Sequence, residues 1–271
     1  MEQWEEWSTS GGEMVGSFPC VCKISITGCP KLNLVAIELI PSLRGLHVEG
    51  CSFAVLRSMA VLSSSIDTLT IDNIKGLTKL HGEVLEHLKA VEDLRISHCA
   101  SLQSIEEKDV NMAISMKSLA YVKINDCTSL ESYSCPNNIA ILTIECCPSI
   151  TSSSFPTMDD LPSTLNDLTI SKCDNMEVSW PLNSFLLSLK YLSIDGIPKL
   201  RLFPEGCLVN LIELTIENCD NIESIPDNGY GFLPRLCKIK CIPLLSPRRR
   251  CDRRIGKYWP IISQIPDHGV Y

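Results

Sequence analysis

The stretch LIELTIENCDNIESIP, residues 211–226, decides the fold through the spacing of its apolar residues. They stand 3, 2, 3, 3 and 3 positions apart, at Leu211, Leu214, Ile216, Cys219, Ile222 and Ile225. The central L-x-I step has the two-residue period of a strand with one buried face, whereas a helix would need about 3.6 residues. We interpret the three-residue steps on either side as tight turns. The stretch therefore predicts one short strand held between turns.

The same pattern recurs along the chain, and each occurrence contains one anchor residue, at the position of the cysteine. Nine further segments fit L-x-x-L-x-I-x-x-C-x-x-L with apolar exchanges, although the last, 233–244, puts Lys238 at an apolar position. The anchors follow one another at intervals of 20 to 28 residues, at Cys29, Cys51, Ile74, Cys99, Cys127, Cys147, Cys173, Ile197, Cys219 and Cys241. This is the period of leucine-rich repeats.

The repeat predicts an α/β-type leucine-rich-repeat solenoid of about ten coils. One coil buries about five apolar side chains, worth roughly 1.5–3 kcal/mol each, whereas ordering some two dozen residues costs roughly 1–2 kcal/mol apiece. Stacked coils share a core, with a curved parallel sheet on the concave face and an irregular, 3-10 or short helical convex side. We expect a non-repeat linker at 1–19, the solenoid at 20–245 and a C-terminal cap at 246–271.

Cysteine occupies eight of these ten anchor positions, so disulfides and zinc must be weighed against simple packing. Neighbouring anchors would stand one coil apart, within disulfide reach in principle. However, Ile74 and Ile197 occupy the same position, and isoleucine neither ligates a metal nor forms a crosslink. No C-x-x-C pair accompanies the anchors. We expect buried filling, with a weak S–H donor directed at a turn carbonyl.

The chain shows no recognisable catalytic motif. His98 precedes Cys99, but strand alternation places Cys99 in the core and His98 on the turn surface. The segment GLHVEGCS, 45–52, has the glycines of a phosphate-binding loop, yet Cys51 stands where the lysine is needed. We therefore expect no enzyme activity, no cofactor and no metal.

Charge and hydropathy limit the partners and the compartment. The net charge is -8, and residues 248–257 carry six bases and one acid, so the rest of the chain stands at -13, an unfavourable balance for nucleic-acid binding. No apolar run of about 18 residues and no basic, apolar leader is present, which predicts neither a membrane span nor a secretory signal. A long chain with an odd number of cysteines, fifteen, favours the reducing cytoplasm.

Beyond the repeat itself, both ends resemble the leucine-rich-repeat region of plant nucleotide-binding leucine-rich-repeat disease-resistance proteins. MEQWEEW, 1–7, and FPCVCKISITGCPKL, 18–32, are similar to a linker and repeat found midway through such regions. CIPLLSPRRRCDRRIGKYWPIISQIP, 241–266, is similar to their terminal segment, and the endings LFP, 202–204, and SIP, 224–226, also fit. The family's nucleotide-binding loop is not found here, so only the sensing and autoinhibitory part is implied, as a fragment or as a stand-alone relative.

The resemblance also bears on the basic segment. It implies a terminal cap in which Trp259, Ile262 and Ile265 cover the last coil, while the arginines are solvated. The alternative is a nuclear import signal or a nucleic-acid patch.

Strand alternation assigns the residues that a partner would contact. If Leu94 and Ile96 face the core, their neighbours face the concave side. Tyrosine and arginine are typical of binding hot spots, so we predict a protein-binding surface that joins aromatic and basic residues to an acidic row. Its residues are Arg95, Tyr121, Lys123, Glu145, Tyr191, Asp195 and Glu217. The alternative for any one of them is a merely solvated face.

The resemblance implies a recognition module of an intracellular immune receptor. Its partners would be a pathogen effector or host protein and, in a full receptor, the nucleotide-binding domain. The alternatives are the substrate-recognition solenoid of a ubiquitin ligase, for which residues 1–19 are too short and acidic to supply an F-box helix, and a cell-wall enzyme or inhibitor, which would carry a secretory signal.

Overall fold

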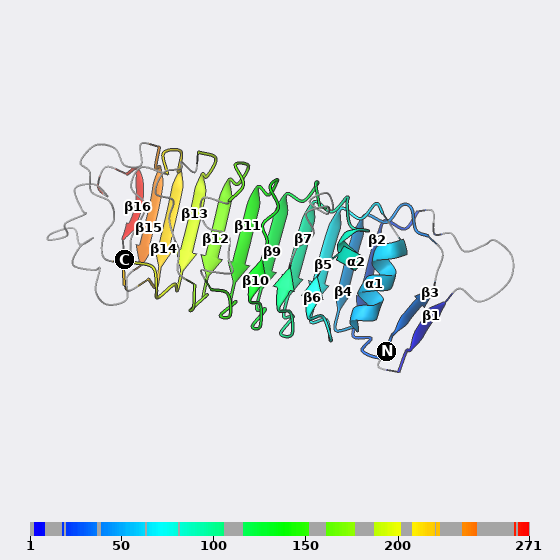
Figure 1. The fold of residues 1–271 in the computed structure, drawn as a ribbon. Coiled ribbons are helices and arrows are strands. Elements are labelled where there is room, and N and C mark those ends of the chain that lie inside the picture. Colours follow the sequence, from blue (N-terminus) through cyan, green and yellow to red (C-terminus); the bar gives the residue numbers. More distant parts are fainter. Residues whose placement is uncertain are drawn as a thin grey trace. The chain divides into compact units, whose positions relative to one another are not determined.

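The computed structural model describes residues 3–8, 18, 20–36, 39–62, 64–80, 82–105, 116–151, 161–176, 187–201, 208–219, 221–222, 235–242, 263 and 265–270. The chain divides into two compact units, Met1–Asn138 and Ile139–Tyr271. Each unit is built around a parallel sheet whose strands follow one another in chain order (Figure 1).

In the described part of the first unit, five main strands pair in parallel, each with the next. They are β2 (Lys23–Thr27), β4 (Gly45–Glu49), β5 (Thr68–Asp72), β7 (Asp93–Ser97) and β9 (Tyr121–Asn125). The register is unbroken: Leu46 faces Leu69, which in turn faces Leu94. Equivalent residues of successive coils therefore form straight rows.

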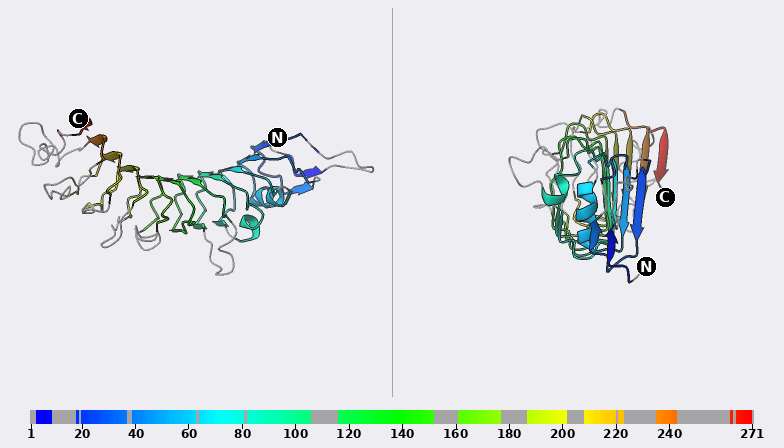
Figure 2. Two further views of the ribbon diagram at one scale, coloured as in Figure 1. Left: turned by 90° about the horizontal axis from the view of Figure 1, so that it is seen from above. Right: turned by 90° about the vertical axis from the view of Figure 1, so that its right-hand side faces the viewer.

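The described residues outside the main strands of the first unit form further short elements. They include β1 (Glu6–Ser8) paired with β3 (Leu34–Ala36), and β6 (Lys79–Leu80), β8 (Ser104–Ile105) and β10 (Ser132–Tyr133) in a second parallel sheet. The helices among these described residues are α1 (Phe53–Leu62) and α2 (Gly82–Leu85). In Figure 2, α1 lies on the side of this unit away from the main strands.

The second unit repeats this plan. Its main strands are β11 (Ile141–Glu145), β12 (Asp167–Ser171), β13 (Tyr191–Asp195), β14 (Glu213–Glu217), β15 (Lys238–Ile242) and β16 (Asp267–Val270). They are parallel and pair in chain order. The predicted fold class, a leucine-rich-repeat solenoid with a parallel sheet, is thus confirmed.

The number of coils departs from the expected ten. Strand β16 adds a rung beside β15, within the segment expected to be a cap. Trp259 and Ile262, expected to cover the last coil, lie outside the described residues, as do the LFP and SIP endings and residues 248–257. The proposed boundaries at 19 and 245 remain predictions.

The alignment of the last coil is corrected by three residues. Ile239 pairs with Leu214 and Cys241 pairs with Ile216, so Cys241 is a strand residue and not an anchor. Lys238 consequently lies on the solvent side, where its side chain is 46% exposed. Leu236 is buried and occupies the first leucine position of the motif, not the second. This shift explains why the sequence pattern put Lys238 at an apolar position.

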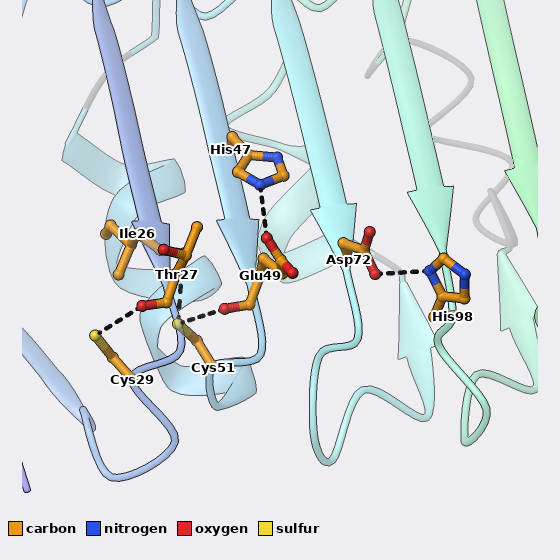
Figure 3. A network of polar contacts seen from close by, with 8 residues as sticks. All are labelled: Ile26, Thr27, Cys29, His47, Glu49, Cys51, Asp72 and His98. Atoms are coloured by element: carbon orange, nitrogen blue, oxygen red, sulfur yellow. Dashed lines mark hydrogen bonds and ion pairs between the residues drawn. The ribbon is translucent and has the colours of Figure 1, made fainter. Parts of the chain in front are cut away.

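The remaining anchors are core residues, each at most 4% exposed. All of the anchor thiols except that of Cys99 donate to the carbonyl two residues earlier; Cys51 Sγ, for example, lies 3.2 Å from the Glu49 oxygen, and Cys219 Sγ lies 3.2 Å from the Glu217 oxygen. Figure 3 shows Cys29 and Cys51 directed at such turn carbonyls. The prediction of buried filling with a weak S–H donor is therefore confirmed for these residues.

The residue before each anchor turns the chain with a left-handed backbone. In nine coils its φ lies between 48° and 64°, at Gly28, Gly50, Asn73, His98, Asp126, Cys146, Lys172, Gly196 and Asn218. This conformation directs its N–H to the next coil, as from Gly28 N to the Glu49 carbonyl oxygen at 2.9 Å. Side chains add further links of this kind, such as Asn175 Nδ2 to the Pro148 oxygen at 2.9 Å and Asn221 Nδ2 to the Pro198 oxygen at 2.7 Å.

Candidate recognition surfaces

The solvent-facing side of the main strands, here called the open face, carries the residues available to a partner. In the main strands from β4 to β14, positions one, three and five are accessible to solvent, while positions two and four are buried. Strands β7 and β9 show this alternation from Asp93 to Ser97 and from Tyr121 to Asn125. Each unit therefore has its own open face with three rows of side chains.

On the first unit, the predicted neighbours come together. Strands β7 and β9 pair Arg95 with Lys123 and Asp93 with Tyr121. The Arg95 guanidinium carbon lies 5.0 Å from the centre of the Tyr121 ring, within the range of a cation–π contact. The predicted adjacency of Arg95, Tyr121 and Lys123 is confirmed.

Asp93 completes this group, and the sequence pattern did not single it out. Arg95 donates from Nε to Asp93 Oδ1 at 3.0 Å and from Nη2 to Oδ2 at 2.9 Å. The hydrogen bond to Asp93, followed by the attraction between the charges, raises the pKa of Arg95 above its ordinary value. The available signal was the D-L-R spacing, because residues i and i+2 of a strand share a face.

Imidazole and carboxylate groups also meet near the ends of the strands, across coils at His98 and within β4 at His47 (Figure 3). His98 Nδ1 lies 2.9 Å from Asp72 Oδ1, and His98 Nε2 lies 4.0 Å from Asp126 Oδ2. His47 Nε2 lies 3.3 Å from Glu49 Oε2. His98 is thus placed on the turn surface, as expected, and Cys99 is buried in the core.

The second unit carries the acidic residues in one row. Strand pairing aligns Glu145, Ser171, Asp195 and Glu217. Asp195 accepts hydrogen bonds from Ser171 Oγ at 3.1 Å and from Asn218 Nδ2 at 2.6 Å. Glu217 pairs with Lys240 Nζ at 2.6 Å. Lys240 therefore neutralises part of the negative charge of this row. The sequence pattern did not assign Lys240 to the open face, because the last coil was aligned three residues out of register.

The first strand positions of this unit form a second row, in which an exposed aromatic ring lies between two acidic residues. Tyr191 is 42% exposed, and strand pairing places it between Asp167 and Glu213. Glu213 binds Lys238, whereas Asp167 is half-buried with no cation beside it in the described part of the unit. Burial, and secondarily the charge of Glu213, raises the pKa of Asp167. Tyr191 was predicted as a site residue, and its two acidic neighbours were not.

Within the described residues, no group of three histidine, cysteine or acidic side chains is arranged to hold a metal ion. The described helices include none that is both long and apolar enough to cross a bilayer.

Stacked parallel strands, buried anchors and an exposed polar face define a leucine-rich-repeat solenoid. No protein-family model matches the chain. RPP13-like protein 1 of Arabidopsis thaliana, named for disease resistance, is 25% identical over 162 residues, which are 54% of this chain and 14% of that protein. Disease resistance protein RPP2A of the same plant is 28% identical over 156 residues, 55% of this chain and 11% of that protein.

Over about half of its length, then, the chain is similar to plant disease-resistance proteins, in agreement with the resemblance of its sequence motifs. It spans only a small part of the length of these relatives. Among solved structures, an internalin of Listeria monocytogenes is 16% identical with a TM-score of 0.35, over 82% of this chain and 73% of that one.

Proposed function

We propose that this chain is a protein-recognition module of plant defence, corresponding to the sensing and autoinhibitory leucine-rich-repeat region of an intracellular immune receptor. Its partners are a pathogen effector or a guarded host protein and, in the parent receptor, the nucleotide-binding domain. It acts in the cytoplasm and without catalysis. Similarity to two disease-resistance proteins supports a role in plant defence, and the exposed polar side chains of the open faces support a role in protein binding.

The observation that carries the proposal is the group formed by Asp93, Arg95 and Tyr121. Arg95 is 49% exposed, yet its guanidinium is held by two hydrogen bonds and one ring contact. A side chain fixed before binding loses less conformational entropy on association. Arginine and tyrosine are also the residues that most often dominate interface energetics. The group is therefore a preformed anchor, extended by Lys123 on the neighbouring strand.

The open face of the second unit offers a separate surface of opposite character. Glu145, Asp195 and Glu217 supply carboxylates along one row, and Tyr191 supplies an exposed ring. Charge of this kind directs encounter and discriminates between partners more than it adds affinity. Basic residues of a partner are the expected complement.

A photo-crosslinking experiment tests the recognition role. The full chain is expressed in plant cells with benzoylphenylalanine at position 121 or, as a matched control, at position 61, because Val61 is 51% exposed on helix α1. We expect irradiation to join the chain to a discrete protein from position 121 and not from position 61. Adding Arg95→Glu should abolish this product while the circular dichroism spectrum stays unchanged.

Equal crosslinking from both positions, or a product that persists with Arg95→Glu, contradicts recognition through this face.

Co-purification of the chain with a separately expressed nucleotide-binding domain of a plant disease-resistance receptor tests the intramolecular role. An open-face charge reversal should weaken that complex, whereas Arg57→Glu on α1 should not.

A further inference from the structure

The first unit shows how its sheet holds a guanidinium group. Asp93 and Tyr121 occupy the first positions of two paired strands, and Arg95, two residues after Asp93, places its guanidinium against both. The carboxylate supplies two acceptors and the ring supplies a π face. The arrangement is local, because it needs only two neighbouring strands.

The second unit has the same aspartate and tyrosine at the same positions, without the arginine. Asp167 is the first residue of β12, Tyr191 is the first residue of β13, and strand pairing joins them as it joins Asp93 to Tyr121. The position equivalent to Arg95 is Thr169, whose short side chain cannot reach across to the ring. Tyr191 is accordingly exposed, whereas Tyr121 is only partly accessible beside Arg95.

The local charges favour a cation from outside the chain. No described residue forms an ion pair with Asp167, and Lys238, two strands beyond Tyr191, is bound to Glu213. Glu213 stands on the other side of Tyr191 and adds negative potential to the same row. Burial together with this neighbouring charge raises the pKa of Asp167, as expected for a carboxylate without a counter-ion.

We propose that Asp167 and Tyr191 form a site for an arginine side chain supplied by a protein partner. The guanidinium lies above Thr169, binds the Asp167 carboxylate through two N–H groups and stacks on the Tyr191 ring, as Arg95 does on the first unit. A lysine fits less well, because a compact ammonium cannot form the two-pronged contact or stack as a plane. That the arginine comes from a protein rests on the proposed recognition function.

The site is tested directly with N-acetyl-arginine amide as the probe. The chain is labelled at its six tyrosines, and ring resonances are followed by NMR while the probe is added. We expect a saturable shift of the Tyr191 resonance, a weaker response to N-acetyl-lysine amide and none to the uncharged citrulline analogue. Asp167→Asn should weaken binding by about two- to five-fold, the range expected for one surface ion pair.

Two exchanges of residues between the units provide matched controls. Thr169→Arg should fill the site from within, shift the Tyr191 ring as the probe does and abolish probe binding. Arg95→Thr should open the equivalent site on the first unit, so that the Tyr121 resonance begins to respond. A Tyr191 ring that ignores the arginine probe, responds equally to citrulline, or responds unchanged in Asp167→Asn overturns the proposal. Because the probe needs no biological partner, this result is independent of the crosslinking outcome.

Discussion

The left-handed residue before each anchor makes a strong prediction at Gly28. Its φ is +64°, and a Cβ added there would meet no atom within 4 Å, so Gly28→Ala isolates the backbone cost from any clash. Left-handed backbone costs a residue with a Cβ about 1–2 kcal/mol. Alanine also reduces the conformational entropy of the unfolded chain, which stabilises the fold by about 0.4–1 kcal/mol. We expect Gly28→Ala to lower the free energy of unfolding by about 0.5–1.5 kcal/mol.

Gly45→Ala is the matched control. Gly45 lies within β4, and its added Cβ would meet the flexible stem of Lys23 at 3.1 Å. Replacing a strand glycine by alanine gains about 0.5–1 kcal/mol, so this variant should be as stable as the parent or slightly more stable. Urea unfolding followed by circular dichroism measures both. A Gly28→Ala protein that matches or exceeds the stability of Gly45→Ala would refute the left-handed turn as a recurring constraint of the coils.

Two further predictions concern buried or crowded polar groups. The Tyr133 hydroxyl is buried, and the Cys135 thiol beside it is only a weak hydrogen-bond partner. Tyr133→Phe should therefore raise the free energy of unfolding by about 1–3 kcal/mol in thermal or urea unfolding. A loss of stability would instead indicate that the hydroxyl is well satisfied, by this thiol or by a water in the adjoining cavity of about 20 Å³. Because the pKa of Asp167 is raised above 3.8 in the fold, its charge opposes folding near neutral pH. Asp167→Asn should therefore be the more stable protein there, with the difference vanishing as the pH falls below about 4; an equal difference at every pH would contradict this cause.

The sequence predicts the repeating part of the fold well, because one short motif carries both the strand and the turn. Each L-x-I step forms the buried side of a strand, and the anchors pack beneath the turns. The alignment fails at 233–244, where a three-residue shift also satisfies the apolar pattern and only pairing with β14 decides between them. Strand β16 escaped prediction since Asp267–Val270 has no such motif.

The candidate site is predictable only in part. Alternation on a strand places Arg95 and Tyr121 on the same face, but the motif gives no rule for how side chains pair across coils. Asp93 and Asp167 acquire their roles from the register between strands, which fixes the neighbour of each side chain. The φ values above zero at residues such as Lys172 were equally hidden, because lysine rarely adopts this conformation.

Side-chain hydrogen bonds between neighbouring coils are a further feature that the sequence pattern does not predict. Thr164 Oγ1 bonds the Ile139 oxygen at 2.8 Å, and Asn210 Nδ2 bonds the Leu187 oxygen at 2.6 Å. Both link turns more than twenty residues apart, and neither of the donors, Thr164 and Asn210, occupies an apolar position of the leucine motif. Such contacts depend on coil length, which varies along the chain.

Thiol labelling tests most directly the central claim that the anchor cysteines fill the core of stacked coils. The thiolate is the reactive form of cysteine, and burial raises the pKa of Cys173 to about 12. Brief alkylation of the folded, unreduced chain followed by peptide mass spectrometry should modify the exposed thiols Cys20, Cys22 and Cys237. Modification of the anchors should require denaturant: Cys29, Cys51, Cys99, Cys127, Cys147, Cys173 and Cys219. Anchors that react as quickly as Cys20 in the native protein, or that are recovered as disulfides, would contradict the stacked solenoid and the recognition surfaces built on it.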